Sequence, residues 1–193
     1  MNQRNLLEVD WSQIPAPSDD GGAAHLEGMM LPSISLLATD DTSVTLSALR
    51  GRTVVFAYPR TGEPGKIALV DDWDMIPGAR GCTPQTCAFR DLFAELKAAG
   101  AAQVFGLSTQ SNAYQTEMAS RLHLPFPVLS DEALELTRAL RLPTMAVAGL
   151  TLIKRLALII DDARISRVFY PVFPPDRNAG DVLEWLKANP RKD

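Results

Sequence analysis

The stretch GARGCTPQTCAFRDLFAELKAAG, residues 78–100, contains both cysteines of the chain, Cys82 and Cys87. Its apolar residues recur at the spacing of one helix face. Thr83 is a residue type that caps helices, and Pro84 suits a first helical position, where its missing N–H costs nothing. The stretch therefore predicts an amphipathic helix with Cys82 at its N-terminal end.

Short apolar runs and amphipathic stretches alternate on both sides of this helix. RTVVFAYP, residues 52–59, is a continuous apolar run that a proline ends, as expected of a buried central strand. The order of elements predicts an α/β fold in which a central sheet carries helices on both faces. The other expected elements are an N-terminal hairpin turning at 39–43, strands at 102–109 and 125–131, helices at 112–122 with Asn112 as cap, at 131–140 with Asp131 as cap and at 178–188, and a hairpin at 149–171 turning at 161–164.

Length and composition describe an ordinary globular protein. The chain has 193 residues, of which 46% are hydrophobic and 22% charged, enough for one domain with a substantial core. A net charge of −4 without a basic cluster argues against a nucleic-acid partner. Glu8 and Asp10 stand where a secretory signal would be apolar, and no run is long enough to span a membrane. We therefore expect a soluble, cytoplasmic protein with an extended N-terminal segment at 1–27 and one domain at 28–193.

The position of the two cysteines suggests redox chemistry. A thiol at a helix N-terminus faces partly positive backbone N–H groups, which favour the nucleophilic thiolate. An ideal helix separates residues five apart by about 7.5 Å along its axis and roughly 140° around it. A disulfide usually needs Cα atoms about 4.4–6.8 Å apart, so Cys82 and Cys87 could bond only if the first turn unwound. The alternative interpretation is that both are free cysteines that fill the core.

Metal binding is the less favoured interpretation. The C-x4-C spacing is poor for zinc, and the two histidines, His25 and His123, are far from the cysteines in sequence. The Gly/Pro-rich loop at 60–81 contains an acidic patch at 71–74, which is more typical of a solvated surface than of a cation site. We expect neither a metal nor a cofactor.

GCTPQTCAFRDLFAEL, residues 81–96, resembles the active-site helix of peroxiredoxins of the AhpC/TSA superfamily. It is most similar to the branch of the bacterioferritin comigratory protein, or peroxiredoxin Q. VVFAYPR resembles the preceding strand of that family, VFGLST and FPVLSD resemble its next two strands, and LIKRLALIIDDARISRVFY resembles its arginine-bearing hairpin. The resemblance covers approximately residues 28–187 and implies a thioredoxin-like fold with an N-terminal β-hairpin addition.

The resemblance implies a thiol-dependent peroxidase and assigns three residues. Cys82 matches the peroxidatic cysteine, which a peroxide oxidises to a sulfenic acid, and Cys87 matches the resolving cysteine of an intramolecular disulfide. Arg155 matches the active-site arginine, whose permanent charge can hold a thiolate and a peroxide. The implied partners are hydrogen peroxide or an alkyl hydroperoxide and a thioredoxin or glutaredoxin-like reductant. The implied assembly is a monomer or homodimer.

The sequence departs from the family just before Cys82. The family motif P-x-x-x-T-x-x-C would need proline at position 75 and threonine at position 79, where Met75 and Ala79 stand. The hydroxyl that positions the substrate is then expected from Thr61 or Thr83, near Pro59 at the strand end, or is missing.

Two other functions fit the same scaffold. One is a redox sensor that passes oxidation to a protein partner, and the other is a non-catalytic binding module with a thioredoxin fold. The combination of Cys82, Cys87 and Arg155 favours the enzyme, whereas the long loop at 60–81 favours the binding module.

Overall fold

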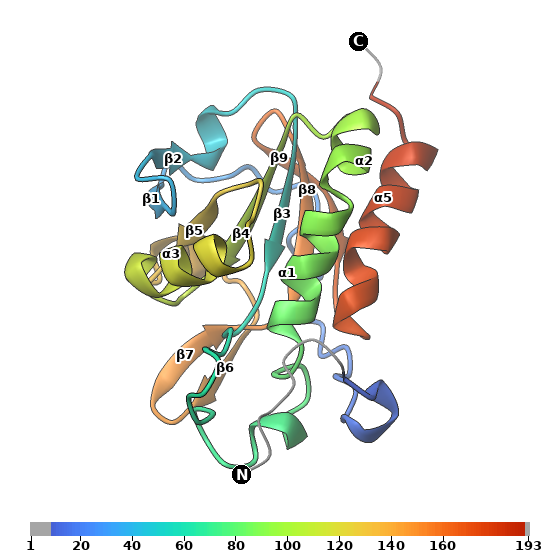
Figure 1. The fold of residues 1–193 in the computed structure, drawn as a ribbon. Helices are drawn as coiled ribbons and strands as arrows, with labels where there is room; N and C mark the ends of the chain where they lie inside the picture. The colour runs from blue at the N-terminus through green and yellow to red at the C-terminus, as the bar shows by residue number, and fades with distance from the viewer. Residues whose placement is uncertain (1–8, 192–193) are drawn as a thin grey trace.

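The computed structural model describes residues 9–191. Its centre is a seven-stranded mixed sheet with the order β2-β1-β5-β4-β3-β8-β9, beside a separate two-stranded sheet of β6 and β7 (Figure 1). The pairs β3–β4 and β4–β5 are parallel, and β8 pairs antiparallel with β3. The strands are β1 (Ser35–Ala38), β2 (Ser43–Thr45), β3 (Arg52–Ala57), β4 (Gln103–Ser108), β5 (Val128–Ser130), β6 (Thr144–Val147), β7 (Leu150–Ile153), β8 (Leu156–Asp161) and β9 (Arg164–Phe169). The helices are α1 (Cys82–Asp91), α2 (Phe93–Ala98), α3 (Asn112–Arg121), α4 (Glu135–Leu140) and α5 (Asn178–Ala188).

The side chains of β3 alternate between two hydrophobic cores. Val54 and Phe56 belong to the core that α1, α2, α3 and α5 cover. Val55 and Ala57 belong to the core on the other face, where α4 packs. Every residue of β3 is buried, which explains the apolar run at 54–57. The predicted α/β sheet with helices on both faces and an N-terminal hairpin is therefore confirmed.

An aromatic stack fixes α1 on the sheet. The ring of Phe89 in α1 lies parallel to that of Phe56 in β3, with centroids 4.1 Å apart and an interplanar angle of 4°. Phe126 meets Phe56 edge-on, with centroids 5.6 Å apart. Because Phe56 and Phe89 are fully buried, each contributes about 1.5–3 kcal/mol of hydrophobic stabilisation. The stack holds α1 so that its N-terminus lies at the carboxyl ends of the parallel strands, where open α/β sheets place their sites.

The start of α1 differs from the prediction. The helix begins at Cys82, and its cap is Gly81 rather than Thr83, with a left-handed φ of 101°. Pro84 is consequently the third helical residue, which is tolerated because N–H groups of the first turn have no intrahelical partner. At Leu92 the backbone leaves helical geometry, with φ −97° and ψ 10°, so the predicted single helix is divided into α1 and α2.

Two further helix predictions need correction. The helix expected at 131–140 forms only as the shorter α4, because Leu134 has a positive φ of 59°. Asp131 nevertheless accepts hydrogen bonds from two backbone N–H groups of α4. In α3 the cap is Ser111 and not Asn112, since the Ser111 hydroxyl accepts a hydrogen bond from the third N–H after it.

The hairpin predicted at 149–171 is correct only in its second half. β8 and β9 pair and turn at 161–164, as expected. The first strand does not reach back to residue 149, because β7 ends at Ile153 and pairs with β6 in a separate hairpin. Arg155 therefore lies in the break between β7 and β8 and not within one strand.

The β6–β7 hairpin supports the long loop at 60–81. Trp73 and Ala79 of the loop form a small buried cluster with Val147 and Leu152 of the hairpin. The loop also contains one short 3-10 turn, Trp73–Met75. The segment before Cys82 is thus packed against the body of the protein.

The N-terminal segment, as far as it is described, follows the surface of the domain. It begins with a 3-10 turn at Trp11–Gln13, and its Leu26 is fully buried in the α4-side core. The predicted boundary between residues 27 and 28 stays a prediction. Within residues 9–191, none of the helices is both long and apolar enough to cross a bilayer.

We expect Phe89→Ala to lower the free energy of unfolding by about 3–5 kcal/mol, because it removes half of the stack and leaves a cavity. Urea unfolding followed by circular dichroism measures this change. The control is Ile67→Ala, at a side chain that is 97% exposed, for which we expect a change within about 0.5 kcal/mol. Equal effects of the two substitutions would contradict the role of the stack.

Candidate active site

The site begins at the N-terminus of α1, where Gly81 turns the chain into the helix. A Cβ atom at this position would lie 2.6 Å from Cγ of Pro175, so only glycine fits both the space and the positive φ. The turn places Cys82 as the first helical residue, with 3% of its surface exposed. Cys82 therefore stands in the first turn of α1, whose backbone N–H groups have no intrahelical partner and favour negative charge nearby. Its thiol donates to the carbonyl of Ala79 at 3.5 Å.

Arg155 is the charged group of the site. Its Nη2 donates to Sγ of Cys82 at 3.2 Å. The same nitrogen lies 3.0–3.3 Å from the carbonyl oxygens of Gly78, Ala79 and Arg80. These three carbonyls form a backbone cradle, residues 78–80, that fixes the guanidinium beside the thiol. The predicted proximity of Cys82 and Arg155 is present in the structure.

Two buried amides extend this arrangement. Nη1 of Arg155 donates to Oε1 of Gln85, and Nε2 of Gln85 donates to Oδ1 of Asn178 at 2.9 Å. Both amides are buried, with exposures of 0% and 1%. Within the described chain, the partners of Arg155 are thus neutral oxygens and the sulfur of Cys82. The positive charge of the guanidinium is therefore directed at the thiol rather than at a carboxylate.

Cys87 lies in the same helix but in a different environment. It is a free, buried thiol on the apolar side of α1, within the core around Phe56 and Phe89. Burial raises the pKa of Cys87, and Arg90 offsets only part of this effect. Cys87 is thus held as a neutral thiol.

The other predicted site residues surround the end of β3. Pro59 is buried, and its carbonyl accepts a hydrogen bond from the Ser108 hydroxyl at 3.2 Å. Thr61 is buried, and its hydroxyl donates to Oε1 of Gln110 at 3.1 Å. Thr83 is buried in the first turn of α1, directly after Cys82. Which of these hydroxyls positions the substrate stays a prediction.

Tyr58 lies close enough to Cys82 to respond to its charge. The phenol is fully buried and donates to Oε1 of Gln115 at 2.9 Å. Burial raises the pKa of Tyr58 well above its usual range, and negative charge on Cys82 raises it further. Tyr58 therefore remains neutral and contributes no competing anion to the site.

The acidic patch of the long loop is not part of this arrangement. Asp74 forms an ion pair with Arg80 at 3.7 Å. Among residues 9–191, no group of three or more His, Cys, Asp or Glu side chains is placed to hold a metal ion.

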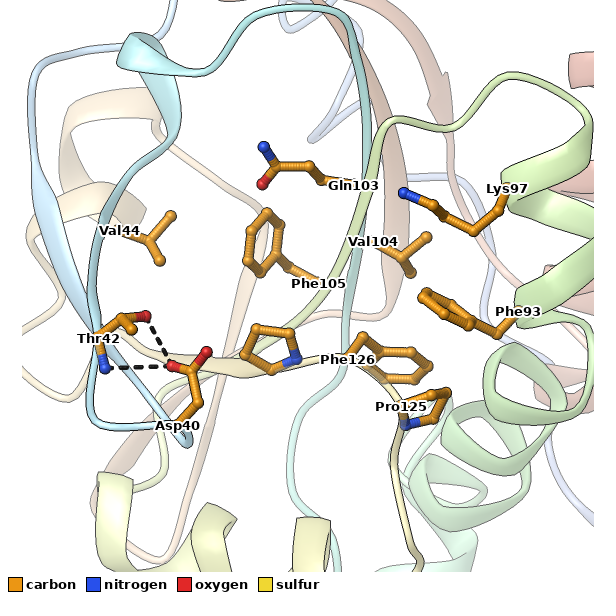
Figure 2. A pocket seen from close by; sticks show the side chains of 11 residues that line it. Asp40, Thr42, Val44, Phe93, Lys97, Gln103, Val104, Phe105, Pro125 and Phe126 are labelled. Carbon is orange, nitrogen blue, oxygen red and sulfur yellow. Dashed lines mark hydrogen bonds between the residues drawn. The ribbon is translucent and has the colours of Figure 1, made fainter.

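A separate groove lies at the opposite end of the parallel strands. It has a volume of about 280 Å³ and is lined by Phe93, Phe105 and Phe126, with Asp40 and Lys97 near its rim (Figure 2). The groove adjoins the beginning of β4, whereas Cys82 follows the end of β3. It is therefore distinct from the cysteine site.

Sequence reasoning missed the groups that hold the arginine. Gln85 stands three residues after Cys82, so its helical spacing on the same face was an available signal. Asn178 is the first residue of α5 and far away in sequence, and no pattern connects it to the cysteines. The backbone cradle at 78–80 has no side-chain signature, because carbonyl oxygens are common to every residue.

Comparisons with known proteins agree with this geometry. A model of the Redoxin family matches residues 26–183. The chloroplastic peroxiredoxin Q of Oryza sativa subsp. japonica is 30% identical over 164 residues, covering 84% of this chain and 67% of the relative. The chloroplastic peroxiredoxin Q of Suaeda salsa is 29% identical over the same length, covering 84% of this chain and 68% of the relative.

Solved structures give the same result for the fold. The peroxidoxin BcpB of Mycobacterium tuberculosis superposes with a TM-score of 0.68 at 26% identity, covering 86% of this chain and 98% of that protein. Peroxiredoxin Q of Xanthomonas campestris has a TM-score of 0.65 at 24% identity, covering 83% and 97%, and supports the fold alone. The family match, the similar sequences and the shared thioredoxin-like fold together show that the chain belongs to the Redoxin family, as a thiol-dependent peroxidase of the peroxiredoxin Q branch.

Proposed function

We propose that Cys82 is the peroxidatic cysteine of this enzyme and that Arg155 activates it. The observation that carries the proposal is the 3.2 Å contact between Nη2 of Arg155 and Sγ of Cys82. A guanidinium without a carboxylate partner stabilises the thiolate over the thiol. The same charge stabilises the negative charge that develops on a peroxide oxygen as its O–O bond breaks.

In the first step, the thiolate attacks one oxygen of hydrogen peroxide or an alkyl hydroperoxide. The S–O bond forms as the O–O bond breaks, and Cys82 becomes a sulfenic acid. The departing hydroxide or alkoxide takes up a proton and leaves as water or alcohol. Sulfur is oxidised by two electrons, and the peroxide is reduced by two.

In the second step, Cys87 attacks the sulfenic sulfur of Cys82. The S–S bond forms, the S–O bond breaks, and hydroxide leaves as water with the thiol proton of Cys87. Both cysteines lie in one continuous helix, so α1 must unwind in its first turn before the sulfurs can bond. Local opening at a helix end is inexpensive compared with opening of the core.

A dithiol reductant of the thioredoxin or glutaredoxin class then reduces the disulfide and is itself oxidised. Such a cycle needs a reducing compartment, and we propose the cytoplasm for it.

A monomer or homodimer stays our prediction for the assembly, and sedimentation velocity measures the assembly state. Membership of the enzyme family favours the peroxidase over the non-catalytic binding module.

Cys82→Ser should abolish peroxide consumption, because the serine hydroxyl is not ionised at neutral pH and does not reduce an O–O bond. Cys87→Ser should complete one turnover and then stop unless a small thiol is added. Peroxide consumption coupled to a thioredoxin system, and then to dithiothreitol, measures both. Substantial activity in Cys82→Ser would refute the assignment.

Arg155→Met should lower the second-order rate constant of Cys82 oxidation on the order of 100- to 1,000-fold, as expected when a donor to a developing negative charge is removed. Stopped-flow mixing with hydrogen peroxide measures this constant. Arg138→Met, at an exposed arginine of α4, is the matched control and should react like wild type. A wild-type rate constant in Arg155→Met would remove the guanidinium from the mechanism.

The alkylation of Cys87 should report its raised pKa. In Cys82→Ser protein, the pH midpoint of iodoacetamide labelling should lie higher in the folded state than in urea. The midpoint shifts to higher pH on folding because burial disfavours the thiolate, so the folded protein keeps the thiol proton to a higher pH. Labelling measured by mass spectrometry between pH 7 and 10.5 gives both midpoints. A lower midpoint in the folded state would contradict the assigned environment.

A further inference from the structure

The N-terminal segment at Asp10–Asp20 lies beside the start of α1 (Figure 1) and outside the family match at residues 26–183. Its first anchor is Trp11. The indole Nε1 donates to Oδ2 of Asp176 at 2.9 Å, and the ring meets Phe173 edge-on with centroids 6.1 Å apart. The segment is therefore attached to the connection between β9 and α5.

The same indole closes the space around the residue before Cys82. A Cβ atom at Gly81 would stand 2.7 Å from Cη2 of Trp11 and 2.6 Å from Cγ of Pro175. Gly81 is thus enclosed between the N-terminal segment and the connection that precedes α5. The backbone of Gly81 cannot rotate far without displacing Trp11 or Pro175, because packed interiors resist overlap.

The second anchor lies at the other end of the segment. Asp20 accepts a hydrogen bond from Nζ of Lys154 at 2.6 Å and another from the Tyr170 hydroxyl at 2.7 Å. Between the anchors, Pro17 packs at Gly78, where a Cβ atom would lie 3.6 Å from Cβ of the proline. Lys154 precedes the active-site arginine in the chain, and Gly78 provides one carbonyl of the cradle. The segment therefore contacts residues that are next to Cys82 and Arg155 in the chain or that hold Arg155 in place.

The segment does not fill all the space beneath it. A cavity of about 230 Å³ is lined by Pro17, Ser18 and Asp20 on one side and by Gly78, Lys154 and Arg155 among the residues of the other. The segment thus bridges a cavity between its two anchors, with Pro17 in contact with Gly78 between them.

Disulfide formation requires movement where the first anchor sits. Gln85 N–H donates to the Gly81 carbonyl at 3.0 Å, and the Thr86 hydroxyl donates to the Cys82 carbonyl at 2.9 Å. Both bonds belong to the turn that must open before the sulfurs of Cys82 and Cys87 can approach. Opening it reorients Gly81, whose surroundings Trp11 occupies.

We propose that Asp10–Asp20 is a strap that holds the first turn of α1 closed, and that its release limits the rate of disulfide formation between Cys82 and Cys87. The inference rests on the proposed two-cysteine cycle. The strap acts on the second step, in which water leaves the sulfenic acid. It leaves the first step unchanged, because its anchors contact Gly81 and Lys154 and not the sulfur that attacks the peroxide.

The chemistry of the second anchor suits a releasable contact. The hydrogen bonds from Lys154 and Tyr170 lower the pKa of the Asp20 carboxyl, so this carboxyl is ionised at neutral pH. The group lies at the surface, where salt screens such pairs and their net contribution is small. The strap is therefore held by an aromatic contact and a hydrogen bond at Trp11 and by a salt-screened ion pair and a hydrogen bond at Asp20.

The experiment measures the two chemical steps separately. One equivalent of hydrogen peroxide is mixed with reduced protein, the reaction is quenched with acid, and mass spectrometry follows the Cys82–Cys87 disulfide over time. Trp11→Ala should speed disulfide formation on the order of tenfold, since it removes an aromatic contact and a hydrogen bond. Asp20→Asn should speed it by about twofold to threefold, as expected for an exposed pair. The first step, measured in a Cys87→Ser background, should stay within about twofold of wild type for both variants, given that the strap leaves the sulfur untouched.

Asp19→Asn is the matched control, since Asp19 is an exposed neighbour that accepts a hydrogen bond from the N–H of Gly21, just after the segment. It should form the disulfide at the wild-type rate. Wild-type disulfide kinetics in both strap variants, confirmed as folded by circular dichroism, would overturn the strap alone. An acceleration confined to the first step would overturn it equally. If wild-type protein itself formed no Cys82–Cys87 disulfide, the proposed cycle would fail and the strap with it.

Discussion

The contact between the Arg155 guanidinium and the Cys82 sulfur is the interaction on which the rest of the site depends. A buried arginine is costly unless its donors are satisfied, and here backbone carbonyls and a neutral amide satisfy most of them. This choice of partners leaves the charge available to the sulfur. A carboxylate in place of Gln85 would neutralise the charge and weaken the preference for the thiolate. In the proposed mechanism, the neutral partners of the arginine therefore matter for Cys82 as much as the arginine itself.

The surrounding fold holds these partners in place. The Phe56–Phe89 stack fixes α1 on β3, which positions the helix start at the end of the parallel strands. The break between β7 and β8 releases Arg155 from strand pairing, so its side chain can reach the cradle at 78–80. The cradle belongs to a long loop that packs on the β6–β7 hairpin through Trp73 and its neighbours. The cradle at 78–80 and Arg155 thus meet because the β6–β7 hairpin supports the long loop and ends next to the arginine.

Hydrophobic periodicity predicted most of the fold, and the family resemblance predicted that Cys82 and Arg155 lie together, as the structure places them. The burial of β3, the span of α5 and the turn of the β8–β9 hairpin follow from local patterns that the structure confirms. The patterns failed where backbone geometry decided the outcome, as at Gly81, Leu92 and Leu134. They also failed in the apolar run around Arg155, because a continuous strand and two strands with a break have the same periodicity. The cradle and Asn178 could not be predicted, since carbonyl oxygens carry no sequence signal and α5 reaches the site only through tertiary packing.

The central claim is that the arginine contact makes Cys82, and not Cys87, the atom that receives oxygen from the peroxide. Trapping of the sulfenic acid tests this most directly. Wild-type protein is treated with less than one equivalent of hydrogen peroxide in the presence of dimedone, and the modified cysteine is identified by peptide mass spectrometry. The account predicts that the early adduct is on Cys82, while Cys87 is found as a free thiol or in the disulfide. An early adduct on Cys87, or oxidation of both cysteines at equal rates, would contradict it.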